Sequence, residues 1–151
     1  MSKALVVYDS VYGNTERVAR ALAKGLEDGG VDVDCMRVDV TKFDELSGYD
    51  LLVVGSPVQG WSVSKPIKAF LERLESVEGL SGKKAFAFDT KMGRSRLVGS
   101  AGGKIEGKLK GLGLTIVKPN VSAVVKGREG PLEEGAEETF KQLGAELAKM
   151  M

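Results

Sequence analysis

The residues best suited to chemistry lie in a short turn near the start of the chain. Residues 10–15, Ser-Val-Tyr-Gly-Asn-Thr, follow the apolar run at residues 4–8 and precede a helical pattern. Hydroxyls, backbone N–H groups and the positive end of a helix dipole would point at one spot there, which suits a phosphate. The turn contains no Lys or Arg and lacks the lysine of G-x-x-x-x-G-K-[ST], so it fits one phosphomonoester held by neutral donors. The alternative is a simple helix cap, with Asn14 or Thr15 as the N-cap.

Two later segments also have a composition suited to a ligand. Residues 55–62, Gly-Ser-Pro-Val-Gln-Gly-Trp-Ser, hold the only Trp of the chain. An aromatic side chain beside glycines suits stacking on a flat ring, although packing of Trp61 over Pro57 or the next helix is the alternative. Residues 89–95, Asp-Thr-Lys-Met-Gly-Arg-Ser, form a third such segment, for which the alternative is a solvated polar turn.

Missing residue types exclude several kinds of chemistry. The chain has no His and one Cys, Cys35. Ser–His and Cys–His nucleophilic catalysis is therefore excluded, and a zinc or iron–sulfur site within one chain is strongly disfavoured. Cys35 lies among Val31, Val33 and Val38, which predicts a buried strand thiol and not a reactive one. These absences favour chemistry supplied by a bound organic cofactor.

Length and composition indicate one globular domain in the cytoplasm. The 151 residues, of which 42% are hydrophobic and 28% charged, predict a single domain over residues 1–151. No apolar run approaches the ~20 residues that cross a bilayer, and the first residues show no signal-peptide pattern. A single cysteine suits a reducing compartment, so we expect a cytoplasmic protein.

Apolar patterning predicts alternating strands and helices. The predicted strands are residues 4–8, 31–37, 51–54, 84–88 and a last region at 114–117 and 121–125, interrupted at Pro119. The predicted helices are residues 14–27, 64–74, 97–112 and 132–149, with only a poor helix between the second and third strands.

This alternation predicts an α/β fold. We expect a three-layer sandwich, with a five-stranded parallel sheet in the order 2-1-3-4-5 and helices on both faces. Ligands bind such sheets beyond the carboxyl ends of the strands, where the strand order reverses. Residues 9–15, 55–62 and 89–95 follow the three strands that flank this point, so we expect them to meet there.

In these three segments the chain resembles the flavodoxin family. The family's phosphate loop, [ST]-x-[ST]-G-[NQ]-[ST] after the first strand, matches residues 10–15. Its two flavin-contacting loops match residues 55–60 and 89–92, and all three lie in the correct order and spacing. The last strand lacks the insertion of the long-chain type, so the chain is similar to a short-chain flavodoxin.

The resemblance implies bound FMN. The turn would hold the phosphate, the second segment would cover one side of the isoalloxazine, and the third would line its other side and the pyrimidine edge. Glycine at position 60 would let its peptide turn over when the flavin takes up one electron. No catalytic residue and no metal ligand is expected. The expected cofactor contacts are Ser10, Val11, Tyr12, Gly13, Asn14, Thr15, Pro57, Val58, Gln59, Gly60, Trp61, Asp89, Thr90, Lys91 and Met92.

Two site residues and the charge depart from the family pattern. Tyr12 replaces a small hydroxyl residue, and Met92 stands where many flavodoxins stack a Tyr, so we expect weaker FMN retention. Residues 83–110 hold eight cations against two anions. Lys91 and Arg94 would stabilise the reduced, anionic flavin, and the basic face would steer a partner with an acidic docking face. The alternative is a solvated helix face.

We therefore expect an FMN-binding electron carrier rather than an enzyme. It would pass low-potential electrons between redox partner proteins of ferredoxin, reductase or oxidoreductase type, as a monomer. The alternatives are an FMN-dependent NAD(P)H:quinone-type reductase and a flavin-free interaction domain. A phosphorylated receiver domain would need Asp where residues 55–57 follow the third strand, and a Rossmann domain would need G-x-G-x-x-G. Binding to nucleic acid or membrane is not expected.

Overall fold

The fold is built on a parallel sheet, as the alternating pattern predicts. The computed structural model describes residues 2–59, 62–93 and 100–151. Its strands are β1 (Lys3–Tyr8), β2 (Asp32–Arg37), β3 (Leu51–Pro57), β4 (Lys84–Met92), β5 (Thr115–Ile116) and β6 (Val121–Val125). They pair in the order β2-β1-β3-β4-β5, and β6 also pairs in parallel with β4. The predicted order is confirmed, with β5 and β6 sharing the fifth position.

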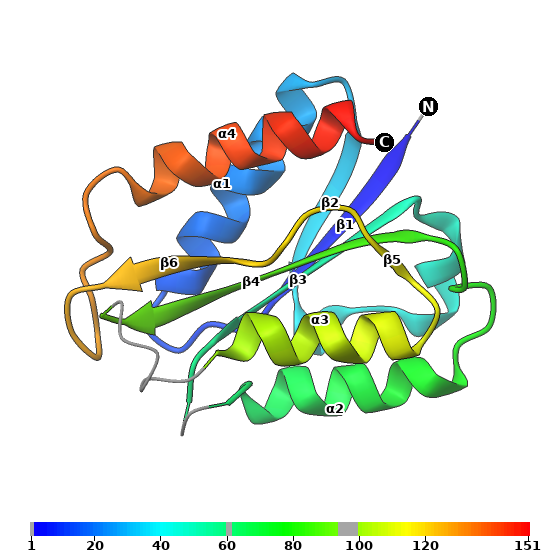
Figure 1. Ribbon diagram of the computed structural model, residues 1–151, viewed down its shortest axis with the longest axis horizontal. Helices are drawn as coiled ribbons and strands as arrows, with labels where there is room; N and C mark the ends of the chain where they lie inside the picture. Colours follow the sequence, from blue (N-terminus) through cyan, green and yellow to red (C-terminus); the bar gives the residue numbers. More distant parts are fainter. Residues whose placement is uncertain (1, 60–61, 94–99) are drawn as a thin grey trace.

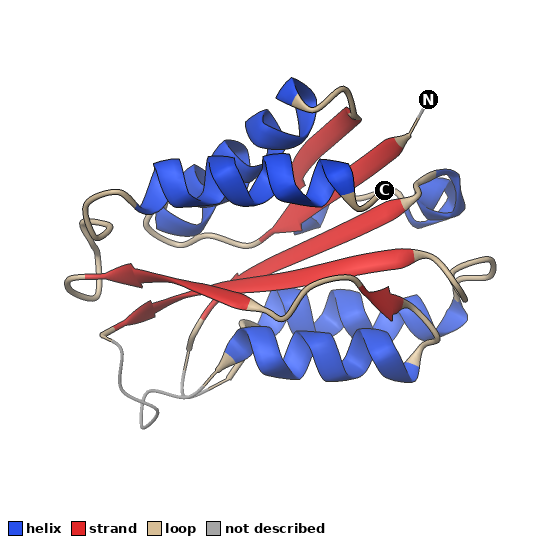
Figure 2. Ribbon diagram, turned by 45° about the horizontal axis from the view of Figure 1, so that its top comes forward, coloured by secondary structure: helices blue, strands red, loops and turns tan. Residues whose placement is uncertain are grey.

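Helices cover both faces of the sheet. They are α1 (Asn14–Asp28), α2 (Lys65–Arg73), α3 (Ala101–Gly111) and α4 (Ala136–Lys149). Helices α1 and α4 lie on one face, and α2 and α3 lie on the other (Figure 1). The turned view in Figure 2 shows the resulting three layers. Short 3-10 helices at Val38–Val40 and Phe43–Gly48 stand where the sequence predicts only a poor helix, and a third, Leu74–Ser76, follows α2.

Each central strand contributes to two cores, because successive side chains of a strand point to opposite faces. On β1, Val6 packs into the core under α1 and α4, whereas Val7 packs into the core under α2 and α3. In the first core, Phe88 of β4 meets Phe140 of α4 edge to face, with ring centroids 5.4 Å apart. Burial on both faces explains why these strands are apolar throughout.

Helices α1 and α4 cross at two glycines. A Cβ atom on Gly25 would lie 1.9 Å from the carbonyl oxygen of Lys141, and one on Gly144 would lie 2.0 Å from that of Leu22. No side chain larger than hydrogen fits at either position without moving a backbone. The helix that starts at the predicted phosphate turn is therefore locked against the last helix of the fold.

Strand β4 is longer than predicted, which corrects the expectation of a loop after Phe88. Residues 89–92 continue the strand despite their polar side chains. Asp89 pairs with Ser56 of β3 on one side and with Ser122 of β6 on the other. Backbone pairing on both sides satisfies N–H and C=O groups whatever the hydropathy of the side chain, so polarity alone did not mark the end of the strand.

Other boundaries also differ from the sequence prediction. Helix α4 begins at Ala136 and not at 132, because Leu132 forms an antiparallel bridge with Val125 and Gly135 enters the left-handed region at φ +85°. Helix α3 begins at Ala101, with Ser100 as N-cap, and the predicted start at 97 lies outside the described residues. The predicted break at Pro119 is confirmed, and the Asn120 N–H donates to Glu106 of α3 at 2.9 Å.

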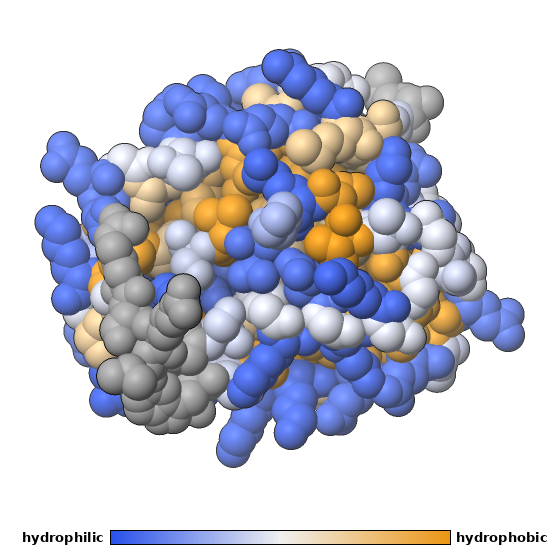
Figure 3. Space-filling view, in the orientation of Figure 1, coloured by the Kyte–Doolittle hydropathy of each residue, from blue (hydrophilic) through white to orange (hydrophobic). Residues whose placement is uncertain are grey.

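The surface follows from this arrangement. Polar side chains cover the outer sides of the helices, while apolar surface shows between α3 and α4, where β5 and β6 form the sheet edge (Figure 3). Partly buried Val117 and Val121 belong to this edge. None of the helices in the described part of the chain is long and apolar enough to cross a bilayer.

Candidate functional site

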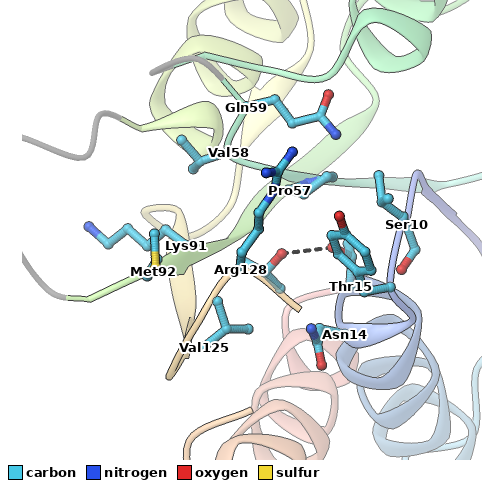
Figure 4. Close-up of a pocket in the computed structure, with 13 residues that line it drawn as sticks. Ser10, Asn14, Thr15, Pro57, Val58, Gln59, Lys91, Met92, Val125 and Arg128 are labelled. Atoms are coloured by element: carbon cyan, nitrogen blue, oxygen red, sulfur yellow. Dashed lines mark hydrogen bonds between the residues drawn. The ribbon is translucent and has the colours of Figure 1, made fainter. Parts of the chain in front are cut away.

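A pocket of about 490 Å³ lies at the carboxyl ends of the strands. This volume falls within the roughly 300–1,000 Å³ typical of small-molecule sites. The side chains converge from the turn after β1, from the ends of β3 and β4, and from the loop between β6 and α4 (Figure 4). The structure thus brings the three predicted segments together. The lining residues are Ser10, Val11, Tyr12, Asn14, Thr15, Pro57, Val58, Gln59, Thr90, Lys91, Met92, Val125 and Arg128.

The turn after β1 presents the start of α1 to the pocket. Gly13 precedes the helix at φ +90°, and neither Asn14 nor Thr15 is the N-cap, which corrects the capping alternative. The hydroxyl of Ser10 instead accepts the N–H of Gly13 at 3.1 Å and that of Glu16 at 3.4 Å. The N–H groups of Asn14 and Thr15 have no acceptor within residues 2–59, 62–93 and 100–151, so they can receive an anion.

Arg37 holds this turn from outside the pocket. Its guanidinium, at the end of β2, donates to the carbonyl oxygen of Ser10 at 3.2 Å. It also lies 3.7 Å from the carboxylate of Asp9. Both contacts restrain the backbone just before the free N–H groups, so the turn is shaped before any ligand arrives.

Two side chains of the turn reach neighbouring segments. The hydroxyl oxygens of Thr15 and Thr90 lie 2.7 Å apart in a buried hydrogen bond, which joins the turn to β4 (Figure 4). Two hydroxyls share one bond, so one hydroxyl hydrogen stays available to a ligand. The amide of Asn14 donates to the carbonyl oxygen of Glu129 at 3.2 Å, and its nitrogen is therefore directed at the β6–α4 loop.

The opposite wall is mainly apolar. Pro57 and Val58 end β3, and the N–H of Val58 donates to the carbonyl of Thr90 at 2.9 Å. Gln59 and Ser62 exchange two backbone hydrogen bonds, of 2.8 and 3.0 Å, which close the segment on itself. Gly60 and Trp61, both predicted to contact the ring, lie outside the described residues.

The end of β4 supplies the remaining side of this wall. Met92 is 51% exposed, so its thioether stands at the rim of the pocket. The amino group of Lys91 points away from the cavity in Figure 4. Lys91 lines the pocket, and its placement beside the flavin stays a prediction, while its predicted companion Arg94 lies outside the described residues.

Asp89 does not line the pocket, although the sequence placed it there. Its side chain is fully buried, and its Oδ2 accepts the N–H of Gly102 at 2.9 Å. Its Oδ1 has no hydrogen-bond partner among the described residues. Gly102 lies in the first turn of α3, where the helix dipole favours a negative charge. Asp89 therefore positions α3 relative to β4.

Val125 and Arg128 are lining residues that the sequence analysis missed. Val125 ends β6, and Arg128 lies in the loop that follows. One signal was available: β6 runs parallel to β4, so the segment after β6 must leave the sheet at the same edge as the predicted loops. Its glycines and glutamates instead suggested a simple connection to the last helix.

The described residues of the predicted basic stretch are spread along the fold, and Arg94 and Arg96 lie outside the described part of the chain. Lys84 begins β4, with Lys83 just before it, at the far end of the strand from Met92. On α3, Lys108 contacts Glu75 of the 3-10 helix after α2, and the amino group of Lys110 lies 3.7 Å from Glu106. These two lysines are thus paired with carboxylates, as the alternative of a solvated helix face suggests.

The Tyr8 hydroxyl and the Cys35 thiol have raised pKa values and stay neutral at pH 7. Burial and the bond that its hydroxyl donates to Glu16, of 2.8 Å, raise the pKa of Tyr8 to about 12. Burial raises the pKa of the Cys35 thiol on β2 to about 11, which agrees with an unreactive strand thiol. The described lining of the pocket contains no carboxylate, thiol or imidazole. The arrangement can bind an anionic, partly flat molecule.

Comparisons with known proteins agree with this geometry. A family model described as Flavodoxin matches residues 6–142. A flavodoxin of Maridesulfovibrio salexigens is 32% identical over 120 residues, covering 78% of this chain and 82% of that protein. An NAD(P)H dehydrogenase (quinone) of Caulobacter vibrioides is 32% identical over 111 residues, and this chain spans only 56% of its length. A solved flavodoxin from the domain Archaea has a TM-score of 0.85 at 28% identity, covering 98% of this chain and 97% of its own.

Proposed function

The chain belongs to the flavodoxin family, and on this premise we propose that its pocket binds FMN and that the protein carries single electrons. The observation that carries the proposal is the pocket itself. Free N–H groups at the start of α1 stand on one side, and apolar side chains from β3 and β4 stand on the other. This is the donor set for a phosphate joined to a flat aromatic ring.

Each wall has a separate part in this proposal. The N–H groups of Asn14 and Thr15, with the hydroxyls of Ser10 and of the Thr15–Thr90 pair, hold the phosphate. Pro57, Val58 and Met92 cover the ring and keep water from it. Gly60 and Trp61, outside the described residues, stay predicted contacts of the ring. Bound FMN supplies the electron chemistry, while the protein orients it and sets its surroundings.

The rim of the pocket suits a redox partner. Flavodoxins pass electrons to partner proteins, and here three exposed side chains, Val11, Tyr12 and Met92, surround the opening. With the outward-pointing amino group of Lys91 at the same place, we infer a partner whose docking face is apolar at its centre and acidic beside it. We further propose that residues 1–151 act as one domain, as a monomer, in the cytoplasm.

A spectroscopic titration tests the function. Apoprotein titrated with FMN should develop a bound flavin spectrum, and stepwise photoreduction should resolve two separate one-electron steps. NAD(P)H should leave this spectrum unchanged over the time of many turnovers. Absence of binding at a large excess of FMN would contradict the proposal and leave a flavin-free interaction domain.

The second candidate is an NAD(P)H-dependent quinone reductase. The Caulobacter vibrioides relative favours it, although the match covers only 58% of this chain and 56% of that protein. The NAD(P)H experiment separates the two. Rapid bleaching of the flavin, followed by reoxidation on addition of a quinone, would assign the reductase activity instead.

A further inference from the structure

The pocket carries a positive charge that its phosphate turn does not supply. Lys91 and Arg128 are the cations among its described lining residues, and no Asp or Glu lines it there. Lys91 points its amino group outward, whereas the Arg128 side chain extends across the cavity toward Pro57 and Gln59 (Figure 4). Within the described part of the chain, Arg128 has no ion pair and donates no hydrogen bond. A cation placed in this way can receive an anionic ligand.

We propose that Arg128 binds the phosphate of the flavin and makes the pocket select FMN over the unphosphorylated flavin. This role rests on the proposed function and refines it. The sequence predicts a phosphate held by neutral donors alone, and the loop after β6 adds the missing charge.

The backbone of Arg128 is held next to the phosphate turn. The Asn14 amide donates to the carbonyl of the adjacent residue, Glu129, at 3.2 Å. A Cβ on Gly130 would lie 3.0 Å from the same amide, so the loop packs closely against the start of α1. The loop is closed by the bond from the Lys126 N–H to the carbonyl of Pro131, of 2.9 Å. The backbone next to Arg128 is thus held beside the start of α1, so a long side chain at this position can reach a phosphate bound there.

The neutral donors of the turn are partly engaged within the protein. The Ser10 hydroxyl accepts hydrogen bonds from two backbone N–H groups. The Asn14 side-chain nitrogen donates to the carbonyl of Glu129, and the Thr15 hydroxyl is hydrogen-bonded to that of Thr90. A phosphomonoester carries a charge of about −1.5 to −2 at pH 7, whereas a helix N-terminus offers only about +0.5. The positive charge of the guanidinium neutralises most of the remaining phosphate charge, and its N–H groups can bind two phosphate oxygens at once.

The test compares two flavins on three proteins. FMN and riboflavin are titrated into the wild-type apoprotein, into Arg128→Gln and into Lys126→Gln, at low and at physiological salt. Lys126 is the matched control, because it is an exposed cation near Arg128 that does not line the pocket. We expect Arg128→Gln to weaken FMN binding about tenfold, or ~1.4 kcal/mol, and to leave riboflavin binding unchanged. Lys126→Gln should change neither, and Arg128→Lys should restore part of the preference.

Each contrary result has a distinct meaning. Equal loss of both flavins in Arg128→Gln would show that the guanidinium acts on the ring, which overturns the proposal. An unchanged FMN affinity would overturn it as well, with the proposed function intact. Failure of the wild type to bind FMN would overturn both.

A second variant tests the positioning of the loop. Asn14→Ala removes the bond to Glu129 and should reduce the preference for FMN severalfold while flattening its salt dependence. Thermal unfolding verifies that the variant is folded. Full retention of the preference would contradict the role given to Asn14.

Discussion

On one side of the pocket the turn at residues 10–15 is fixed by directional polar contacts, and on the other the ends of β3 and β4 present apolar side chains. The turn is bonded to β2 through Arg37, to β4 through Thr90 and to the β6–α4 loop through Glu129. In the apolar wall, the hydrogen bonds of Val58, Gln59 and Ser62 join backbone groups, and the Met92 side chain is half exposed. The conformation of the turn therefore depends on the positions of three other elements, whereas the wall depends mainly on apolar side chains of suitable size.

This difference indicates that the hydrogen-bonded turn, more than the apolar wall, determines which ligand the site binds. Hydrogen bonds depend on distance and angle, so loss of one partner leaves its mate unsatisfied at a cost of about 1–3 kcal/mol. Apolar contact is non-directional and scales with area, so one side chain can replace another of similar size. We therefore expect a Met in the place of an aromatic residue in the wall to cost less binding than the loss of one hydrogen-bonding group in the turn.

The largest effect is expected from Thr15→Val. The substitution keeps the shape but removes the bond to Thr90, leaves that buried hydroxyl without its partner and deletes a phosphate donor. We expect FMN to bind roughly 10–100-fold more weakly and unfolding to require about 1–3 kcal/mol less. Isothermal titration and urea unfolding measure the two changes.

Thr41→Val provides the matched control for this substitution. The Thr41 hydroxyl is buried, has no hydrogen-bond partner in the described part of the chain and does not line the pocket. Its loss should leave FMN affinity unchanged and stability equal or slightly higher. Similar losses from both threonines would refute the special role of the turn.

A smaller effect is expected from Met92→Ala in the apolar wall. Removing the side chain from a half-exposed rim should weaken FMN and riboflavin alike by about threefold, since the contact involves the ring and not the phosphate. Met150→Ala, at an exposed position after α4, controls for loss of a methionine. A loss confined to FMN would erase the distinction between the two walls.

The smallest effect is expected from Lys91→Glu. The amino group points away from the cavity, where water and salt screen its charge, so both flavin midpoint potentials should move by less than ~20 mV. Potentiometric titration measures this, with Lys83→Glu at the other end of the sheet as reference. A larger negative shift would return Lys91 to the position beside the flavin that the sequence suggested.

The order of the strands could be predicted from the sequence because it follows from the alternation of apolar strands with amphipathic helices. Buried parallel strands must be apolar, and amphipathic helices must separate them, so residues 51–54 and 14–27 were found with small boundary errors. The end of β4 was missed because backbone pairing with β3 and β6 continues through Asp89 whatever its side chain. That boundary is therefore set by pairing with neighbouring strands, which the local sequence pattern does not reveal.

The site could be predicted only where its residues follow a strand directly. Ser10, Thr15 and Thr90 were found for this reason. Arg128 was missed because its place depends on a loop folding back onto Asn14, more than a hundred residues earlier in the chain. Asp89 was misplaced because a strand position alone does not tell whether a carboxylate faces the ligand or the start of a helix.

The lock between α1 and α4 has a consequence for how the protein is made. The turn that receives the ligand is translated before the helix that packs against its own helix at Gly25 and Gly144. Strand β6 and Arg128, which line the pocket from its other side, also follow the turn in the chain. The pocket therefore cannot form until these distant segments have been made and have paired. We expect the cofactor to bind only after α4 has packed against α1.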